Sequence, residues 1–325
     1  MPEPPTPARD ARPAESVTSP AALPPSPHRE PEKRGLSATF SALHERDFAW
    51  YFAGNIAFFM AMQMQMLLRG FLAFELTDAA TVVEGAKSIK SVDELALIHR
   101  SVTLTEAAMT HMEAALRPGM SENELWSIFN QHVLATGGEY AETRLLSSGA
   151  RTNPWFQECS DKIIAPGELV AFDTDIVGCF GYYTDFSRTF HVPGAGAPNA
   201  EQKALYRMAA DQLERNIALL RPGMSFRDYS RQAWPIPDGY RENRYLDIVH
   251  GCGMTGEWPL IAHDMDWDDV GYDGDIEPGM TLCVEAYIGH RDGTEGVKLE
   301  EQVLITEDGI DRLSTYGYSE TLMAE

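Results

Sequence analysis

The chain has 325 residues, 44% of them hydrophobic and 23% charged, so it is long enough for one large folded domain or two ordinary ones. Its 49 acidic residues outnumber 26 Lys and Arg, and the formal net charge of −23 argues against nucleic-acid binding. Four scattered cysteines without a CxxC pair fit neither a disulfide framework nor a thiolate zinc site, so we expect a cytoplasmic protein.

The first 34 residues have the composition of a disordered tail. They contain ten of the 20 prolines and lack the apolar periodicity that would compensate the entropy lost on ordering. They also lack the basic region and apolar core of a signal peptide. We therefore expect residues 1–34 to be disordered.

An apolar helical segment is predicted over residues 35–80. Residues 48–68 carry no formal charge and reach about the 20 residues that a bilayer-spanning helix needs. Asn55, Gln63 and Gln65 interrupt this run. Residues 40–78 resemble the first transmembrane helix of major-facilitator transporters. Two interpretations stay open, membrane contact through residues 48–68 or a helix that packs on the domain behind it.

From residue 81 onward the pattern predicts one α+β domain that extends to residue 325. Apolar residues at helical spacing predict a helix from Val92 to about Leu116, and Ser121 with Glu124 forms the capping box of the next helix. The sequence Leu-Arg-Pro-Gly-Met-Ser occurs at 116–121 and again at 220–225. This recurrence indicates two related halves.

Three aspartates lie in the first pair of predicted strands. The strand-like runs are 169–177, 182–192, 281–288 and 297–306. Asp173 and Asp175 are two residues apart, so we expect them on one strand face, and hairpin pairing would place Asp185 beside them. Three acids at one spot repel each other unless a cation neutralises them.

Three more candidate ligands come from the C-terminal part of the chain. His250 precedes a Gly-Cys-Gly sequence, and Glu285 lies inside an otherwise apolar strand, where an unpaired carboxylate is costly to bury. Glu300 faces the same site if its neighbours Val297 and Leu299 face the core. One imidazole and five carboxylates suit two divalent ions, with Mn, Fe and Zn all compatible.

These motifs together resemble the pita-bread superfamily of creatinase, methionine aminopeptidase, prolidase and aminopeptidase P. The sequences 142–159, 172–175, 185–188, 250–253 and 298–302 are most similar to the group of metal-dependent dimethylsulfoniopropionate lyases. The resemblance covers about residues 82–320. It implies a pita-bread fold with pseudo-two-fold halves, a homodimer, a small zwitterionic or carboxylate substrate, and these metal ligands: Asp173, Asp175, Asp185, His250, Glu285 and Glu300.

Two histidines that peptidases of this superfamily keep are missing here. The position seven residues after the metal histidine is Glu257, and the position about seventeen before the first aspartate is Phe156 or Trp155. Those histidines hold and protonate the scissile amide in the peptidases. Their absence disfavours an Xaa-Pro peptidase of the prolidase or aminopeptidase P type, which stays the alternative within the enzyme class.

The lyase resemblance implies β-elimination to dimethyl sulfide and acrylate. A cationic sulfonium is recognised by aromatic faces, and the candidate substrate-binding residues are Trp155, Phe156, Tyr183, Tyr245 and Trp258. The lyases place their basic aspartate six residues after the metal histidine, where this chain has Gly256. We therefore expect Glu257 to act as the catalytic base. A metal-binding domain without catalytic activity is the alternative from a different class.

Overall fold

The computed structural model describes residues 45–57, 60, 64–65 and 79–325. The chain divides into two units, Met1–Leu76 and Thr77–Glu325. In the first unit residues 46–57 are helical, and the aromatic side chains of Trp50 and Tyr51 are exposed. The predicted disordered tail, and much of the transporter-like segment, lie outside the described residues. Among the residues that are described, no helix combines the length and the apolar character that crossing a membrane requires.

The second unit begins with three helices whose starts follow from their sequence. They are α3 (Ala79–Ser88), α4 (Val92–Ala115) and α5 (Glu122–Ala135). Ser121 and Glu124 form a reciprocal capping box at the start of α5, as predicted, and Ser91 and Glu94 do the same for α4. Each box supplies hydrogen-bond partners to backbone N–H groups that have none within the helix.

The strands form three antiparallel sheets in the order β1-β4-β5, β2-β3-β6 and β11-β10-β9-β7-β8. Their bounds are β1 (Tyr140–Ala141), β2 (Leu146–Ser148), β3 (Leu169–Asp173), β4 (Ile176–Val177), β5 (Tyr183–Thr184), β6 (Ser187–His191), β7 (Val249–Cys252), β8 (Gly256–Ile261), β9 (Thr281–Gly289), β10 (Gly296–Ile305) and β11 (Ile310–Arg312). The predicted strands 281–288 and 297–306 are thus β9 and β10.

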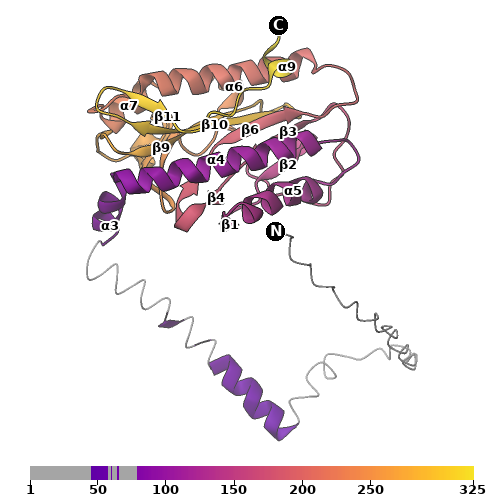
Figure 1. The fold of residues 1–325 in the computed structure, drawn as a ribbon, viewed down its shortest axis with the longest axis vertical. Coiled ribbons are helices and arrows are strands. Elements are labelled where there is room, and N and C mark those ends of the chain that lie inside the picture. Colours follow the sequence, from indigo (N-terminus) through magenta and orange to yellow (C-terminus); the bar gives the residue numbers. More distant parts are fainter. Residues whose placement is uncertain (1–44, 58–59, 61–63, 66–78) are drawn as a thin grey trace, which may run out of the picture. The chain divides into compact units, whose positions relative to one another are not determined.

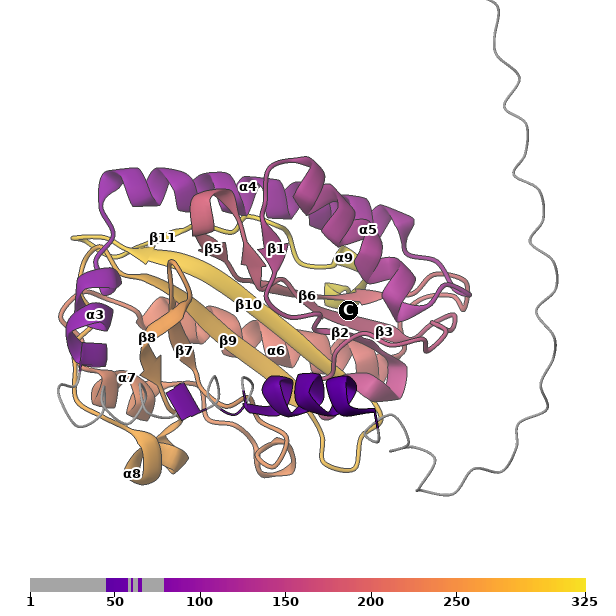
Figure 2. The same ribbon diagram turned by 90° about the horizontal axis from the view of Figure 1, so that it is seen from below.

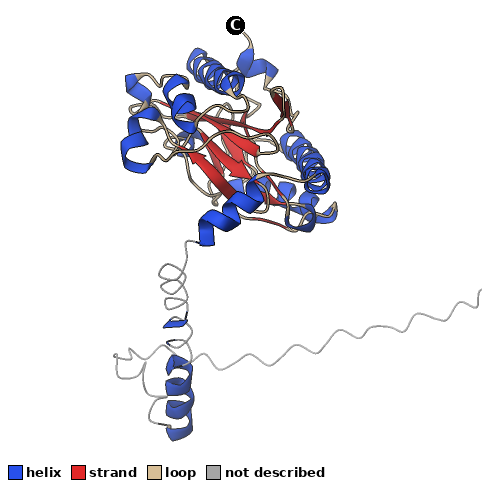
Figure 3. Cartoon of the chain, turned by 90° about the vertical axis from the view of Figure 1, so that its left-hand side faces the viewer, coloured by secondary structure: helices blue, strands red, loops and turns tan. Residues whose placement is uncertain are grey.

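Helices cover the outer faces of the five-stranded sheet and of the β2-β3-β6 sheet (Figures 1, 2 and 3). The remaining helices are α6 (Ala200–Leu219), α7 (Phe226–Gln232), α8 (Trp267–Val270) and α9 (Glu320–Met323). One apolar core joins α6 to β7, β9 and β10, and a second joins α4 and α5 to β3 and β6. Each half of the domain therefore has its own helix-on-sheet core, which confirms the α+β class.

The repeated sequence at 116–121 and 220–225 forms the same turn in both halves. Gly119 and Gly223 adopt φ of 91° and 77°, a region that glycine enters without a steric penalty. The N–H of Gly119 donates to the carbonyl of Ile164 at 2.9 Å, and that of Gly223 donates to Ile276 at 2.8 Å. The predicted two related halves are confirmed by these matching turns.

Side chains join the β2-β3-β6 sheet to the five-stranded sheet where β6 lies beside β10. The hydroxyl of Thr189 donates to the carbonyl of Lys298 at 2.8 Å and accepts from its N–H at 3.1 Å. On β10, Val297 and Leu299 enter the core that contains α6. Alternation therefore turns Lys298 and Glu300 to the opposite face.

The two predicted strands at 169–177 and 182–192 are interrupted, which corrects one expectation. β3 ends at Asp173 and β4 begins at Ile176, and between them Asp175 has φ of 40°. Asp173 and Asp175 therefore do not alternate along one regular strand. Asp185 likewise lies in a break, between β5 and β6. Period-two reasoning failed here because the backbone leaves the extended conformation at Asp175.

Candidate metal centre

Three aspartates of the N-terminal half meet at the strand breaks. Asp173, Asp175 and Asp185 each offer a carboxylate oxygen, and these oxygens lie within 4.8 Å of one another. Asp173 and Asp185 are buried, and the Thr143 hydroxyl donates a short hydrogen bond to Asp175. The hydroxyl of Ser187 donates to Asp173 at 2.7 Å. The aspartates are therefore held close together although no single strand carries them.

The C-terminal half brings one imidazole and two glutamates to the same place. The Nε2 of His250 on β7 lies 3.4 Å from Glu285 Oε1, 3.6 Å from Glu300 Oε1 and 3.6 Å from Asp185 Oδ2. Glu285 on β9 and Glu300 on β10 are directly opposite each other in the antiparallel register. The six residues, called the six-residue cluster below, are Asp173, Asp175, Asp185, His250, Glu285 and Glu300.

A buried lysine forms ion pairs within this cluster. Lys298 has no exposed surface, and its Nζ lies 2.7 Å from Glu285 Oε2, 2.8 Å from Glu300 Oε2 and 3.1 Å from Asp173 Oδ2. Burial alone would lower the pKa of Lys298, but these carboxylates raise it well above its ordinary value. The ammonium therefore supplies one positive charge to five carboxyl groups.

The remaining negative charge is poorly compensated. Burial, together with neighbouring carboxylates, raises the pKa of Asp173 and Asp185 well above the ordinary range and that of Glu285 to about 7. Glu300 differs, because Lys298 and His250 outweigh its burial and lower its pKa. Buried carboxylates whose pKa is raised in this way bind either a proton or a cation.

The residues present fit divalent metal ions. Glu285 Oε1 and Glu300 Oε1 are buried without a hydrogen-bond partner, and both face the imidazole of His250. Oxygen atoms left unsatisfied beside a nitrogen ligand are the donor set that Mn, Fe and Zn accept. The cluster thus has both the spare donors and the spare charge for metal.

Two residues at the cluster were not proposed as ligands from the sequence. Lys298 lies two residues before Glu300, and Cys283 lies two before Glu285, so strand alternation places each on the face of the cluster. Cys283 Sγ lies within 4.8 Å of ligand atoms of Asp185, His250 and Glu300. Burial raises the pKa of this thiol well above its ordinary value, so it stays protonated.

The five candidate aromatic residues fall into three places. Trp155 is buried and the partly buried Tyr245 packs against the same group of residues, with Lys298 Nζ 4.8 Å from the ring centre of Tyr245 and 6.0 Å from that of Trp155. Phe156, which is 56% exposed, lies 6.0 Å from Tyr245 ring to ring. Tyr183 packs with Cys283, and Trp258 packs edge-on against Phe226. Trp155, Phe156 and Tyr245 therefore form one aromatic wall.

Glu257, the base expected from the sequence, is paired with lysines. It lies on β8 with 6% of its surface exposed, and Lys90 donates a short hydrogen bond to its Oε1. Lys87 Nζ lies 3.6 Å from its Oε2. Glu257 and His250 both line a cavity of about 460 Å³. The carboxylate thus lies beside the cluster but is neutralised by cations from α3 and the segment after it.

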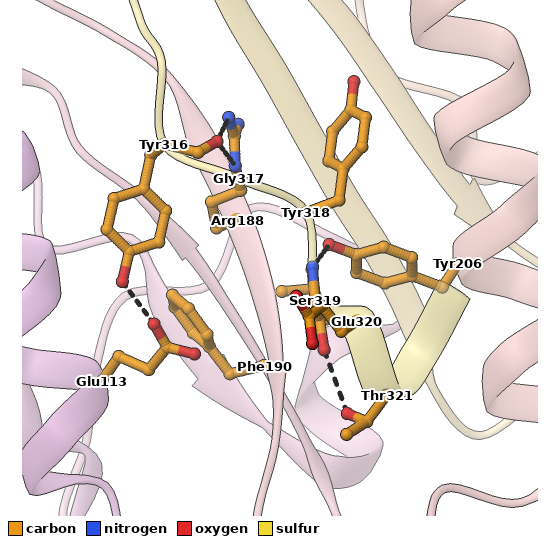
Figure 4. Close-up of a pocket in the computed structure, with 11 residues that line it drawn as sticks. Glu113, Arg188, Phe190, Tyr206, Tyr316, Gly317, Tyr318, Ser319, Glu320 and Thr321 are labelled. Atoms are coloured by element: carbon orange, nitrogen blue, oxygen red, sulfur yellow. Dashed lines mark hydrogen bonds between the residues drawn. The ribbon is translucent and has the colours of Figure 1, made fainter. Parts of the chain in front are cut away.

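The backbone behind Glu300 is fixed from the far side of β10. Arg188 is 1% exposed, and its Nη1 donates to the carbonyl of Glu300 at 2.8 Å while its Nη2 pairs with Glu301 Oε1 at 2.6 Å. Figure 4 shows its guanidinium directed at the carbonyl of Tyr316, at the edge of an outer pocket of about 420 Å³. Arg188 therefore links Glu300 to the C-terminal segment.

Comparison with known proteins identifies related sequences over this domain. The model of metallopeptidase family M24 matches residues 96–307. A dimethylsulfoniopropionate lyase from Roseobacter denitrificans is 37% identical over 255 residues, and one from Roseovarius nubinhibens is 38% identical over 255 residues. Each alignment covers 77% of this chain and 57% of the relative. The chain therefore spans 57% of the length of these two relatives.

Solved structures share the same architecture. The prolidase from Pyrococcus furiosus superposes with a TM-score of 0.63 and 25% sequence identity, covering 72% of this chain and 67% of that chain. Such a score indicates a common fold over the matched part. It agrees with the helix-covered sheets and paired halves described above.

Proposed function

The chain belongs to metallopeptidase family M24, and from that premise we propose that it is a metal-dependent lyase of this family that cleaves dimethylsulfoniopropionate by β-elimination. The six-residue cluster is proposed to hold two divalent ions, with Fe, Mn and Zn as candidates. The observation that carries the proposal is the meeting of these residues, with unsatisfied oxygens on Glu285 and Glu300, beside one aromatic wall. The named activity of the two lyase relatives supports the choice of substrate.

The metal ions, when bound, would supply a Lewis acid that holds the substrate carboxylate and makes its α-proton easier to remove. The rings of Tyr245 and Trp155 already face the ammonium of Lys298. Ring faces of this kind attract cations, so we propose that the aromatic wall receives the sulfonium, with Tyr183 and Trp258 as further substrate-binding residues outside the wall. The cavity of about 460 Å³ suits a small substrate.

An Xaa-Pro peptidase is the second candidate, favoured by the fold of the prolidase from Pyrococcus furiosus. Glu257 and Phe156 stand where the peptidases of the superfamily have histidines, which argues against it. A metal-binding domain without activity is the third reading, and the number of buried carboxyl groups argues against that one. Burying them without a function would cost stability and bring no benefit.

A headspace assay tests the proposal. Full-length protein loaded with Mn or Fe should release dimethyl sulfide from dimethylsulfoniopropionate, and the Asp185→Asn variant should not. Faster cleavage of an Xaa-Pro dipeptide would replace the lyase by the peptidase. Full metal occupancy with neither activity would indicate the binding domain. The expected homodimer and the cytoplasmic location stay predictions, the former open to light scattering on the purified protein.

A further inference from the structure

One buried carboxylate near the six-residue cluster has an oxygen without a hydrogen-bond partner among the described residues. Asp247 lies directly before β7, three residues ahead of His250, and only 5% of its surface is exposed. Its Oδ1 is buried and accepts no hydrogen bond, and among the described residues no cation lies within 4.0 Å of its carboxylate. A buried polar group left in this condition costs free energy, and such costs are retained mainly at functional sites.

Asp247 shares a cavity with the cluster. The residues that line the cavity of about 460 Å³ include Asp247, His250, Glu257, Trp258 and Tyr272. Burial raises the pKa of Asp247, whereas the nearby His250 and Lys298 lower it and Glu300 raises it. A carboxyl group whose pKa is raised by burial binds a proton more strongly than a solvated carboxyl group does. A general base that works near neutral pH needs this property.

Glu257 has the opposite environment although it lines the same cavity. Lys90 and Lys87 both lie against its carboxylate, so its oxygens are engaged in ion pairs. A carboxylate engaged in this way is not free to approach a substrate proton. Gly256 stands at the position where the lyases have their basic aspartate. It has no side chain, and no atom lies within 4 Å of where its Cβ would be.

We propose that Asp247 is the general base that removes the α-proton of the substrate, an inference that rests on the lyase function proposed above. The Asp247 carboxylate takes the proton from the α-carbon, and the C–H electron pair forms the carbon–carbon double bond. The bond between the β-carbon and sulfur breaks, and its electron pair leaves with dimethyl sulfide. Acrylate is the second product, and Asp247 returns the proton to solvent.

The assignment gives the chain a base where it lacks the aspartate of the lyases. The carboxylate absent from position 256 on β8 is replaced by one that enters the same cavity from the segment before β7. Glu257 then has a different part in the fold, holding α3 and Lys90 against β8.

Kinetics on three Mn-loaded variants test the inference. Asp247→Asn should lower kcat for dimethyl sulfide release by roughly 100- to 10,000-fold, the range of general-base catalysis, with metal content unchanged and KM altered much less. Glu257→Gln should lower kcat by less than Asp247→Asn does. Asp269→Asn, an exposed acid on α8, is the matched control and should behave as wild type. A kcat for Asp247→Asn within tenfold of wild type, or a larger loss in Glu257→Gln, overturns the inference.

A second readout does not depend on turnover. Because the pKa of Asp247 is raised in the fold, its ionised form destabilises the folded state, and this penalty appears as pH rises through that pKa. Metal-free Asp247→Asn should therefore have a higher Tm than wild type at pH 8, with the difference vanishing near pH 4. An equal Tm at both pH values contradicts an unpaired Asp247. Wild type that releases no dimethyl sulfide removes the lyase proposal itself, and the base assignment with it.

Discussion

In the N-terminal half of the domain the acids of the six-residue cluster lie at the ends of strands or between them, whereas in the C-terminal half they lie within regular strands. Asp175 adopts φ of 40° in a break, while Glu285 and Glu300 face each other across the continuous β9 and β10. The two halves nevertheless share the same turn, which follows α4 at Gly119 and α6 at Gly223. One scaffold thus presents acidic side chains in two ways.

The difference shows that a shared scaffold does not dictate how a site is built on it. In continuous strands alternation decides which face a side chain occupies, and Lys298 then pairs with both Glu285 and Glu300 on that face. At the breaks, backbone geometry does not determine direction, and hydrogen bonds from Thr143 and Ser187 orient Asp175 and Asp173. The N-terminal half therefore depends on second-layer contacts for precision.

The largest expected effect comes from a comparison of Asp185 with Asp175. Possible ligand atoms form two groups in the structure, and Asp185 belongs to both of them. Asp185 lies close to Asp173 and Asp175, and also to His250 and Glu300, whereas Asp175 belongs to the first group only. Asp185→Asn should lower the affinity for both ions by more than about 100-fold, since even outer residues change metal affinity by 10- to 100-fold. Asp175→Asn should remove one ion.

Metal content per chain, measured by elemental analysis after dialysis, checks this expectation. Asp269→Asn serves as the control, because its side chain is exposed on α8. Two ions retained by Asp175→Asn would show that the N-terminal half contributes less than the geometry indicates.

A second effect, on stability instead of metal affinity, is expected where the halves share a counterion. Lys298 from the C-terminal half pairs with Asp173 from the N-terminal half as well as with Glu285 and Glu300. Lys298→Met should destabilise the metal-free protein by about 3–5 kcal/mol, because it leaves buried carboxylates without their cation. Added Mn should recover part of this loss, since metal bound to the folded state stabilises it.

Urea unfolding with and without Mn measures both quantities. Lys203→Met, at a partly exposed position on α6, is the matched control and should change stability by no more than about 0.5 kcal/mol. Identical unfolding of Lys298→Met and wild type in the absence of metal would mean that the acids take up protons instead of needing the ammonium.

The smallest effect tests whether the scaffold itself is equivalent in the two halves. Gly119→Ala and Gly223→Ala should each cost about 1–2 kcal/mol, the penalty for placing a Cβ in the left-handed region. No atom lies within 4 Å of the added carbon at either position, so only the backbone contributes. Gly309→Ala, with equal space and no positive φ, is the control. Clearly unequal losses of stability in Gly119→Ala and Gly223→Ala would show that the two turns are not equivalent.

Most of the fold could be predicted from the sequence, because its signals are local. The capping boxes, the repeated turn and the strands β9 and β10 follow from residue types at fixed spacing. The strand break at Asp175 could not be predicted, since non-glycine residues with positive φ have no reliable sequence signal.

For the candidate site, the sequence indicated which residue types converge but not their ionic partners. Lys298 shares a strand face with Glu300 and was visible by alternation, yet its pairing with Asp173 depends on how the two halves meet. Lys90 and Glu257 are separated by 167 residues, and no local pattern links them. The unpartnered state of Asp247 is equally non-local, because it depends on what surrounds the carboxylate in three dimensions.

The contact between Lys90 and Glu257 bears on how this protein should be shortened for crystallography. The family match begins at residue 96, but Lys90 precedes it, and its N–H also donates to the carbonyl of Gly279 at 2.9 Å. A fragment that begins at residue 96 would lack Lys87 and Lys90. It would therefore lose the ion pairs that hold Glu257 at the edge strand β8. Fragments that begin before residue 79, ahead of α3, keep the ion pairs of Lys87 and Lys90 with Glu257.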